Sequence, residues 1–272
     1  MENHKLKKID IRFQEVLARG EKVLVSGVPV GYPSLDETIK LVDIYLKGGI
    51  DVVEFSMPAE NPYIDTKVIA DSNVKALELE SNLDRYFSVI RSIRAKYPDE
   101  PFYMMAYADL IERYGIDNFV TQLKESEIDG LELPDKDEMV PYFAEELEKK
   151  LKENGVYRIY FLQHPFNANY VNQIKEETAG FVILQSIANQ QGKRPFVDPA
   201  NQQIIDQLKA IINTPVVLGY GIKTAEDVRK AVSFGADGIL VGTAMIEHIN
   251  TGNYDAFLSY IHGLKQATIH AQ

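Results

Sequence analysis

The sequence predicts an α/β protein in which eight strand–helix units close into a (β/α)8 barrel. Short apolar runs rich in β-branched and aromatic residues alternate along the chain with longer segments of helical spacing. The runs are continuously apolar, as in Phe102–Tyr107, which is typical of parallel strands covered by helices. Eight runs in 272 residues give about 34 residues per unit, close to the ~30 residues of a βαβ unit.

The predicted strands are Val23–Val28, Asp51–Phe55, Phe102–Tyr107, Gly130–Leu133, Tyr157–Leu162, Gly180–Leu184, Pro215–Leu218 and Gly238–Val241. The predicted helices span residues 36–47, 67–79, 84–96, 116–125, 139–153, 169–177, 200–212, 224–233 and 253–266. A doubly wound open sheet is the alternative, but it would have fewer strands and usually a glycine-rich turn after the first.

Several helix ends carry their own signals. Ser34 with Glu37 forms a capping-box pattern, and Gly49 follows the end of the same helix. Thr224 caps a later helix, whose first turn carries Glu226 and Asp227 beside the positive end of the helix dipole.

An additional amphipathic helix is predicted over residues 2–19, before the first strand. Its apolar residues Ile9, Phe13, Val16 and Leu17 share one face, which suits a lid on the barrel floor. No Pro/Gly/Ser-rich linker divides the chain. We therefore expect a single domain over residues 1–272, a TIM barrel with an extra N-terminal helix.

Composition excludes several classes of protein. The chain has 29 basic and 40 acidic residues, a net charge of −11, which argues against nucleic-acid binding. It has no cysteine, hence no disulfide or thiolate metal site. The five histidines, His4, His164, His248, His262 and His270, show no metal-ligand spacing. Neither a signal peptide nor a membrane-spanning run of ~18 apolar residues is present, so we expect a cytoplasmic protein.

Active sites of such barrels lie at the carboxyl ends of the strands. Glu54 interrupts an apolar strand near its end, and Asp65 lies on the loop that follows. Two acids in unlike environments can divide the roles of general acid and general base. The alternative is a structural Glu54 that pairs with a lysine or arginine.

The last two strands end in glycine-rich turns. Gly219-Tyr220-Gly221 follows one strand and Gly242-Thr243 the next. Glycines let backbone N–H groups approach an anion, and a helix starting at Thr243 would direct further amides there. The turns predict a phosphate site, unless these glycines serve the turns alone.

The same segment resembles a known family. Its G-Y-G-I-K-T-A-E-D-V and A-D-G-I-L-V-G-T-A-M-I runs are similar to G-F-G-I-S-x-P-E-x-V and A-D-G-x-x-V-G-S-A-I-V of the tryptophan synthase alpha chain family. Val30–Ser34 resembles A-G-D-P-S, and Gly49–Glu54 resembles G-A-D-I-I-E. Met105–Tyr107 and Tyr114–Ile116 resemble M-x-Y and Y-G-I. The resemblance covers nearly the whole chain, and the family's barrel also has an extra N-terminal helix.

The resemblance implies a lyase that needs no cofactor and cleaves indole-3-glycerol phosphate to indole and glyceraldehyde-3-phosphate by a retro-aldol reaction. It implies that Glu54 protonates the indole ring carbon and that Asp65 is the partner of the indole N–H. Tyr107 would lie near the reacting end, and Tyr220 replaces a phenylalanine of the phosphate loop. The substrate phosphate would lie against Gly192, Gly221, Gly242 and Thr243, the last in place of the family's serine.

Two loops depart from the family pattern. The loop Pro58–Lys67 has Asn61 in place of an aspartate and Thr66-Lys67 in place of Gly-Pro. This loop normally contacts the beta subunit, so its altered sequence weakens the expectation of a tryptophan synthase beta subunit as partner. After the sixth strand the family has G-V-T-G, of which only Gly192 remains, so Gln191 would replace the threonine that positions the catalytic aspartate.

Polar side chains also fall where the family lines an apolar pocket for indole. They are Glu132, Gln163 and Gln185. An unpartnered buried polar group costs about 1–3 kcal/mol, and a flat apolar ring supplies no partner. Either these side chains bond to one another or the pocket holds a more polar ligand. A one-residue shift of the strand would instead turn Glu132 toward the helices.

Three functions remain open at this point. The first is the lyase of the family, acting on a phosphorylated small molecule. The second is a divergent paralogue with a different, more polar phosphorylated substrate. The third is a catalytically silent barrel that binds a partner or effector. Retention of Glu54 and Asp65 favours the enzymes, whereas the altered loops favour the second or third function.

Overall fold

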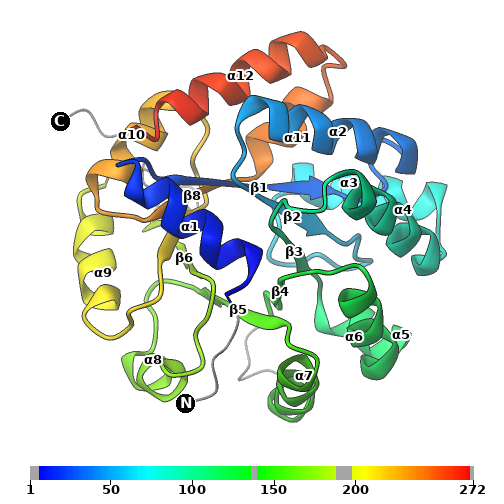
Figure 1. Cartoon of the computed structure of the whole chain (residues 1–272), viewed down its shortest axis with the longest axis horizontal. Helices are drawn as coiled ribbons and strands as arrows, with labels where there is room; N and C mark the ends of the chain where they lie inside the picture. Colours follow the sequence, from blue (N-terminus) through cyan, green and yellow to red (C-terminus); the bar gives the residue numbers. More distant parts are fainter. Residues whose placement is uncertain (1–5, 136–139, 188–197, 270–272) are drawn as a thin grey trace.

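The structure is a computed structural model that describes residues 6–135, 140–187 and 198–269. Eight parallel strands form a closed barrel in the order β1 to β8, and helices surround it (Figure 1). The strands are β1 Val23–Pro29, β2 Val52–Ser56, β3 Phe102–Met105, β4 Gly130–Glu132, β5 Tyr157–Leu162, β6 Val182–Gln185, β7 Val216–Gly219 and β8 Gly238–Val241. The predicted (β/α)8 TIM barrel with an extra N-terminal helix is confirmed.

The helices follow the predicted order. They are α1 Lys8–Ala18, α2 Leu35–Gly48, α3 Lys67–Leu79, α4 Leu83–Lys96, α5 Ala108–Tyr114, α6 Ile116–Glu125, α7 Pro141–Glu153, α8 Ala168–Ile174, α9 Ala200–Lys209, α10 Ala225–Ser233, α11 Thr243–Ile249 and α12 Tyr254–Gln266. The predicted N-caps are confirmed: the Glu37 backbone N–H donates to Ser34 Oγ at 3.1 Å, and Thr224 forms a capping box with Asp227. Of the capping box predicted at Ser34 only this half forms, because the Glu37 carboxylate bonds to Lys40 and Tyr254.

The prediction was wrong between β3 and α6. The strand expected over residues 102–107 ends at Met105, and α5 starts at Ala108. The Ala108 backbone N–H donates to Asp135 Oδ2 at 2.7 Å, so a carboxylate from the β4 loop caps this helix. A cap supplied 27 residues away in the sequence leaves no local signal. Helix α1 begins at Lys8, and residues 2–5 of the range predicted for this helix lie outside the described residues.

Side chains alternate between the two faces of each strand. Val52 points into the barrel with other inner apolar residues, whereas Val53 and Phe55 pack in the core between strands and helices. Glu54 shares the inner face with Val52 and pairs in register with Tyr103 of β3. The inner row of each strand therefore determines what lies at the carboxyl end of the barrel.

Helix α1 closes the opposite end of the barrel, across which it lies in Figure 1. Ile9, Phe13 and Val16 are at most 2% exposed and belong to the inner apolar cluster. The ring of Phe13 stacks on Phe181 at 5.4 Å, and Phe181 meets the ring of Tyr103 edge-on at 5.2 Å. Burial of each apolar side chain contributes roughly 2 kcal/mol to the free energy of folding. Helix α1 is therefore an integral part of the barrel and closes its amino-terminal end.

Candidate active site

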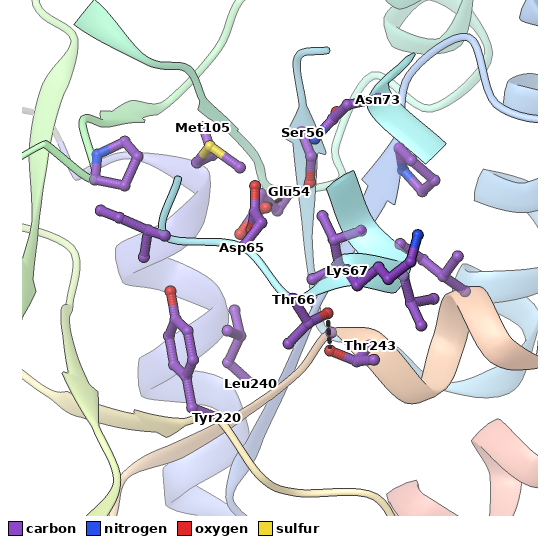
Figure 2. A pocket seen from close by; sticks show the side chains of 18 of the residues that line it. Glu54, Ser56, Asp65, Thr66, Lys67, Asn73, Met105, Tyr220, Leu240 and Thr243 are labelled. Atoms are coloured by element: carbon purple, nitrogen blue, oxygen red, sulfur yellow. Dashed lines mark hydrogen bonds between the residues drawn. The ribbon is translucent and has the colours of Figure 1, made fainter. Parts of the chain in front are cut away.

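A cavity of about 470 Å³ opens at the carboxyl ends of the strands. Among the predicted site residues it is lined by Glu54, Asp65, Tyr107, Glu132, Tyr220, Gly221, Gly242 and Thr243 (Figure 2). Gln191 and Gly192 lie outside the described residues. The barrel thus brings together residues that are spread over 190 positions of the sequence, at the end of the barrel where active sites of this architecture lie.

Glu54 lies deep in the cavity on the inner face of β2 and is 7% exposed. Its carboxylate accepts hydrogen bonds from Ser56 Oγ at 2.6 Å and from the hydroxyl of Tyr103. Burial raises the pKa of Glu54, and the two hydroxyl donors offset part of that increase. Its partners are neutral hydroxyls and not a lysine or arginine, so Glu54 does not have the geometry of a structural ion pair.

Gly27 on β1 makes the space that this carboxylate occupies. The two residues are paired in register across β1 and β2. A Cβ atom at Gly27 would lie 2.8 Å from Glu54 Oε1 and 2.8 Å from Ser56 Oγ. Neither contact fits an ordinary van der Waals separation, so a side chain at this position and the present orientation of Glu54 exclude each other.

Asp65 extends into the cavity from the loop between β2 and α3. Its pKa is raised to about 7, mainly by burial; the hydrogen bond from the Tyr107 hydroxyl at 3.0 Å opposes this increase, and the nearby Glu54 charge adds to it. Asp65 is therefore a carboxyl that titrates near neutral pH beside a second, more deeply buried one. Two carboxyls in unlike environments can divide the roles of general acid and general base.

Tyr107 fixes this loop against the barrel. Its ring is buried and lies 5.4 Å from the ring of Tyr63, which belongs to the same loop as Asp65. The Tyr63 hydroxyl bonds to the Asp135 carboxylate, which also caps α5. One carboxylate thus connects the loop after β2 to the loops after β3 and β4.

The glycine-rich turns line the opposite side of the cavity. Tyr220 and Gly221 have φ angles of 73° and 78°, so two consecutive residues adopt the left-handed conformation. The Ser186 hydroxyl donates to the Tyr220 carbonyl at 2.6 Å and holds this turn. Gly242 is the N-cap of α11, which begins at Thr243 as predicted. The turn residues and the start of α11 therefore face the same space.

Thr66 joins the two sides of the cavity. Its hydroxyl lies 3.0 Å from the Thr243 hydroxyl, across 177 positions of the sequence, as the dashed line in Figure 2 shows. Thr66 replaces the glycine of the family pattern described above. This contact therefore involves a residue at which the chain differs from that pattern. It connects the loop that carries Asp65 to the predicted phosphate site.

Glu132 also lines the cavity, which resolves the strand-shift alternative in favour of the inner face. Its neighbour Leu131 packs with the outer core. Gln163 instead lines a separate cavity of about 180 Å³, beside Phe161 and Phe166. Glu132 therefore supplies the polar lining at the β4 side of the main cavity. The three polar side chains Glu132, Gln163 and Gln185 do not form a cluster there.

Sequence reasoning did not select Gly27, Ser56, Thr66 and Tyr103, nor the cavity residues Met105 and Lys223, as part of the site. Ser56 is two positions from Glu54, and the period of a strand places both on one face, so this partner could have been found. Gly27 and Tyr103 depend on the register between strands, which the sequence of one chain does not reveal.

Two further observations bear on the kind of protein. Within the described residues, no group of three or more His, Asp or Glu side chains is arranged to hold a metal ion. In the same part of the chain, no helix is both long enough and apolar enough to span a membrane.

Known proteins share this sequence and fold. The description of the tryptophan synthase alpha chain family matches residues 13–267. A tryptophan synthase alpha chain from Caldicellulosiruptor saccharolyticus is 31% identical over 251 residues, which cover 91% of this chain and 94% of the relative. Another from a Thermoanaerobacter species is 30% identical and covers 91% of this chain and 92% of the relative.

Solved structures agree with this result. The tryptophan synthase subunit alpha from Legionella pneumophila superposes with a TM-score of 0.87 at 27% identity, covering 97% of this chain and 99% of that chain. A protein of Aquifex aeolicus superposes with a TM-score of 0.88 at 26% identity, covering 97% and 100%. Since sequence and fold match along almost the full length, this chain belongs to the tryptophan synthase alpha chain family.

Proposed function

We propose that this protein is a lyase that cleaves indole-3-glycerol phosphate to indole and glyceraldehyde-3-phosphate. The observation that carries the proposal is the pair of acids in the cavity: Glu54, buried and bonded to two hydroxyls, and Asp65, whose pKa burial raises to about 7. A catalytically silent relative would have no need to keep two carboxyls in positions where burial destabilises their charged forms.

Glu54 would supply and recover the proton. Cleavage needs a proton on ring carbon C3, after which the bond from C3 to the glycerol carbon breaks and the hydroxyl on that carbon loses its proton as the aldehyde forms. A carboxyl whose pKa is raised remains protonated at the start and can donate to C3. The resulting carboxylate can then accept the hydroxyl proton, so Glu54 returns to its initial state.

Asp65 would stabilise the ring while C3 is protonated. Protonation at C3 leaves positive charge on the ring nitrogen, and a carboxylate that accepts the N–H hydrogen bond favours this charge. Because its pKa is about 7, Asp65 is partly ionised near neutral pH, and the charge on the ring would draw it further toward the ionised form. Tyr107 keeps the carboxylate in place through its 3.0 Å hydrogen bond.

The phosphate would bind at the turns after β7 and β8. Gly221, Gly242 and the Thr243 hydroxyl line that part of the cavity, and Lys223 lies at the same rim. Backbone amides and a hydroxyl are sufficient ligands for a phosphate group in barrels of this architecture. The resemblance also implies phosphate contacts from Gln191 and Gly192, which lie outside the described residues.

A direct assay tests the proposal. The protein is incubated with indole-3-glycerol phosphate, with and without a tryptophan synthase beta subunit, and indole is measured. We expect indole release, and we expect Glu54→Gln to reduce its rate by about 10³-fold or more because the proton donor is lost. Glu146→Gln, on an exposed face of α7, is the matched control. Absence of indole from folded protein under both conditions would refute the proposal.

The comparison with and without the beta subunit also tests the partner. The loop after β2 would form part of the contact, and here it is held by an ion pair between Glu60 and Arg113 with N···O 2.5 Å as well as by Tyr63. We expect a protein adapted to a beta subunit to release indole at least ~10-fold faster in its presence. An unchanged rate would indicate that this chain works alone.

A further inference from the structure

Glu132 is an ionisable group in the cavity for which the proposed reaction has no use. It is the last residue of β4, lies on the inner face and is 5% exposed. Glu54 and Asp65 each accept hydrogen bonds from neighbouring hydroxyls. In the described part of the chain, the groups that act on the Glu132 carboxyl group are the charges of Glu54, Asp65 and Arg158, and no hydrogen bond contributes to its pKa. A buried polar group directed into a cavity without a partner indicates that a ligand supplies the partner.

The surroundings of Glu132 favour a neutral carboxyl group. Burial raises the pKa of Glu132 well above its usual value, and the charges of Glu54 and Asp65 raise it further. Arg158 attracts the carboxylate and opposes this increase, while its guanidinium group also donates to the Leu133 carbonyl at 3.4 Å. A neutral carboxyl group offers one O–H donor and a carbonyl acceptor. It therefore suits a ligand group that both donates and accepts a hydrogen bond.

The position of β4 defines which part of the ligand it meets. In the closed order of eight strands, β4 lies across the barrel from β8, and the turns after β7 and β8 form the proposed phosphate site. A substrate whose phosphate lies at those turns extends its other end toward β3 and β4. On β3, Met105 pairs in register with Glu132, so the ring would pack against an apolar side chain and turn one edge to Glu132.

We infer that Glu132 makes this site selective for a ring that carries a hydroxyl or amino group, so the preferred substrate is a hydroxy- or amino-substituted indole-3-glycerol phosphate. The inference rests on the proposed function, because it places the ring end of that substrate against β4. The substituent bonds to the Glu132 carboxyl group. An unsubstituted ring leaves this carboxyl group buried without a partner, which lowers the affinity for that ring.

Equilibrium binding tests the inference independently of turnover. Indole, the four hydroxyindoles substituted on the six-membered ring and the corresponding aminoindoles are titrated into the full chain by calorimetry with saturating glycerol 3-phosphate. We expect at least one substituted ring to bind about tenfold or more tightly than indole. Glu132→Leu should abolish this preference and increase the affinity for indole, whereas Glu132→Gln, which can still donate and accept, should retain most of the preference.

Two results would overturn the inference. One is equal binding of indole and all substituted rings by the wild-type protein. The other is a lower melting temperature for Glu132→Leu, because that loss would show that the carboxyl group has a partner within the chain. The reverse reaction, in which glyceraldehyde-3-phosphate condenses with each ring, separates the two proposals. Turnover of indole without preference for substituted rings contradicts the role of Glu132 alone, and preferential binding without any turnover contradicts the lyase alone.

Discussion

Substitution of Gly27 by alanine tests the geometry of the proton donor most directly. The added Cβ would lie 2.8 Å from Glu54 Oε1 and 2.8 Å from Ser56 Oγ, whereas ordinary contacts begin at 3.4 Å, so each oxygen must move by about 0.6 Å. Gly27 is itself in a strand with no positive φ, so the backbone accepts alanine. The strain therefore falls on the Glu54 carboxyl group and its hydrogen bonds.

We expect Gly27→Ala to reduce the kcat of indole release by about 100-fold, because a displacement of this order misaligns the reacting groups. KM should change by less than about threefold, since the proposed phosphate site lies on other strands. Gly263→Ala is the control: a Cβ there meets nothing within 4 Å, and in the interior of α12 it should stabilise the protein by about 0.5–1 kcal/mol without changing kcat. A Gly27→Ala protein with kcat within threefold of wild type would refute the assignment of Gly27 as the space for Glu54.

Three further predictions concern the two acids and the phosphate. Tyr103→Phe removes a donor that holds the pKa of Glu54 down, so the loss of kcat at high pH should move to higher pH in a pH–rate profile; an unmoved profile would contradict the role of Glu54 as acid. The Asp65 pKa is raised from 3.8 to about 7, so the folded protein retains a proton that the unfolded chain loses, and stability falls as pH rises through this window. Urea unfolding should therefore show the stability of Asp65→Asn relative to wild type growing by about 4 kcal/mol from pH 4 to pH 8, and a pH-independent difference would exclude the shift. Thr243→Ala should raise KM for the phosphorylated substrate about tenfold and leave kcat within about twofold, as initial rates would show, because it removes one phosphate ligand far from the ring.

The alternation of apolar runs and helical segments was sufficient to predict the barrel and most of its elements. The strands Tyr157–Leu162 and Gly238–Val241 have the predicted bounds, because largely apolar runs between turn residues are typical of buried parallel strands. The helix over residues 108–114 was missed because its cap, Asp135, comes from another loop. Local sequence propensity cannot reveal a capping residue that only the folded structure brings close to the helix.

The same limit applies to the site. Glu54 and Asp65 could be selected because a charged residue at a strand end has few structural roles, and the barrel brings both to one cavity. Their environment could not be predicted, since the partners Tyr103 and Gly27 belong to adjacent strands and depend on register. The pKa of about 7 for Asp65 follows from burial and from the distances to its neighbours, neither of which a single sequence contains.

The floor formed by α1 determines how protons reach Glu54. Below this carboxyl group, Tyr103, Phe181 and Phe13 form a continuous column of packed rings that ends on α1 and fills this line toward the amino-terminal end of the barrel. We therefore expect exchange with solvent to pass through the mouth of the cavity, where the proposed substrate would bind. While a ligand is bound, the proton that leaves the hydroxyl would remain with Glu54. In heavy water, the hydrogen isotope that Glu54 donates to the ring would therefore be the one that it acquired while the enzyme was empty between turnovers. It would not be taken from the solvent at the moment of cleavage.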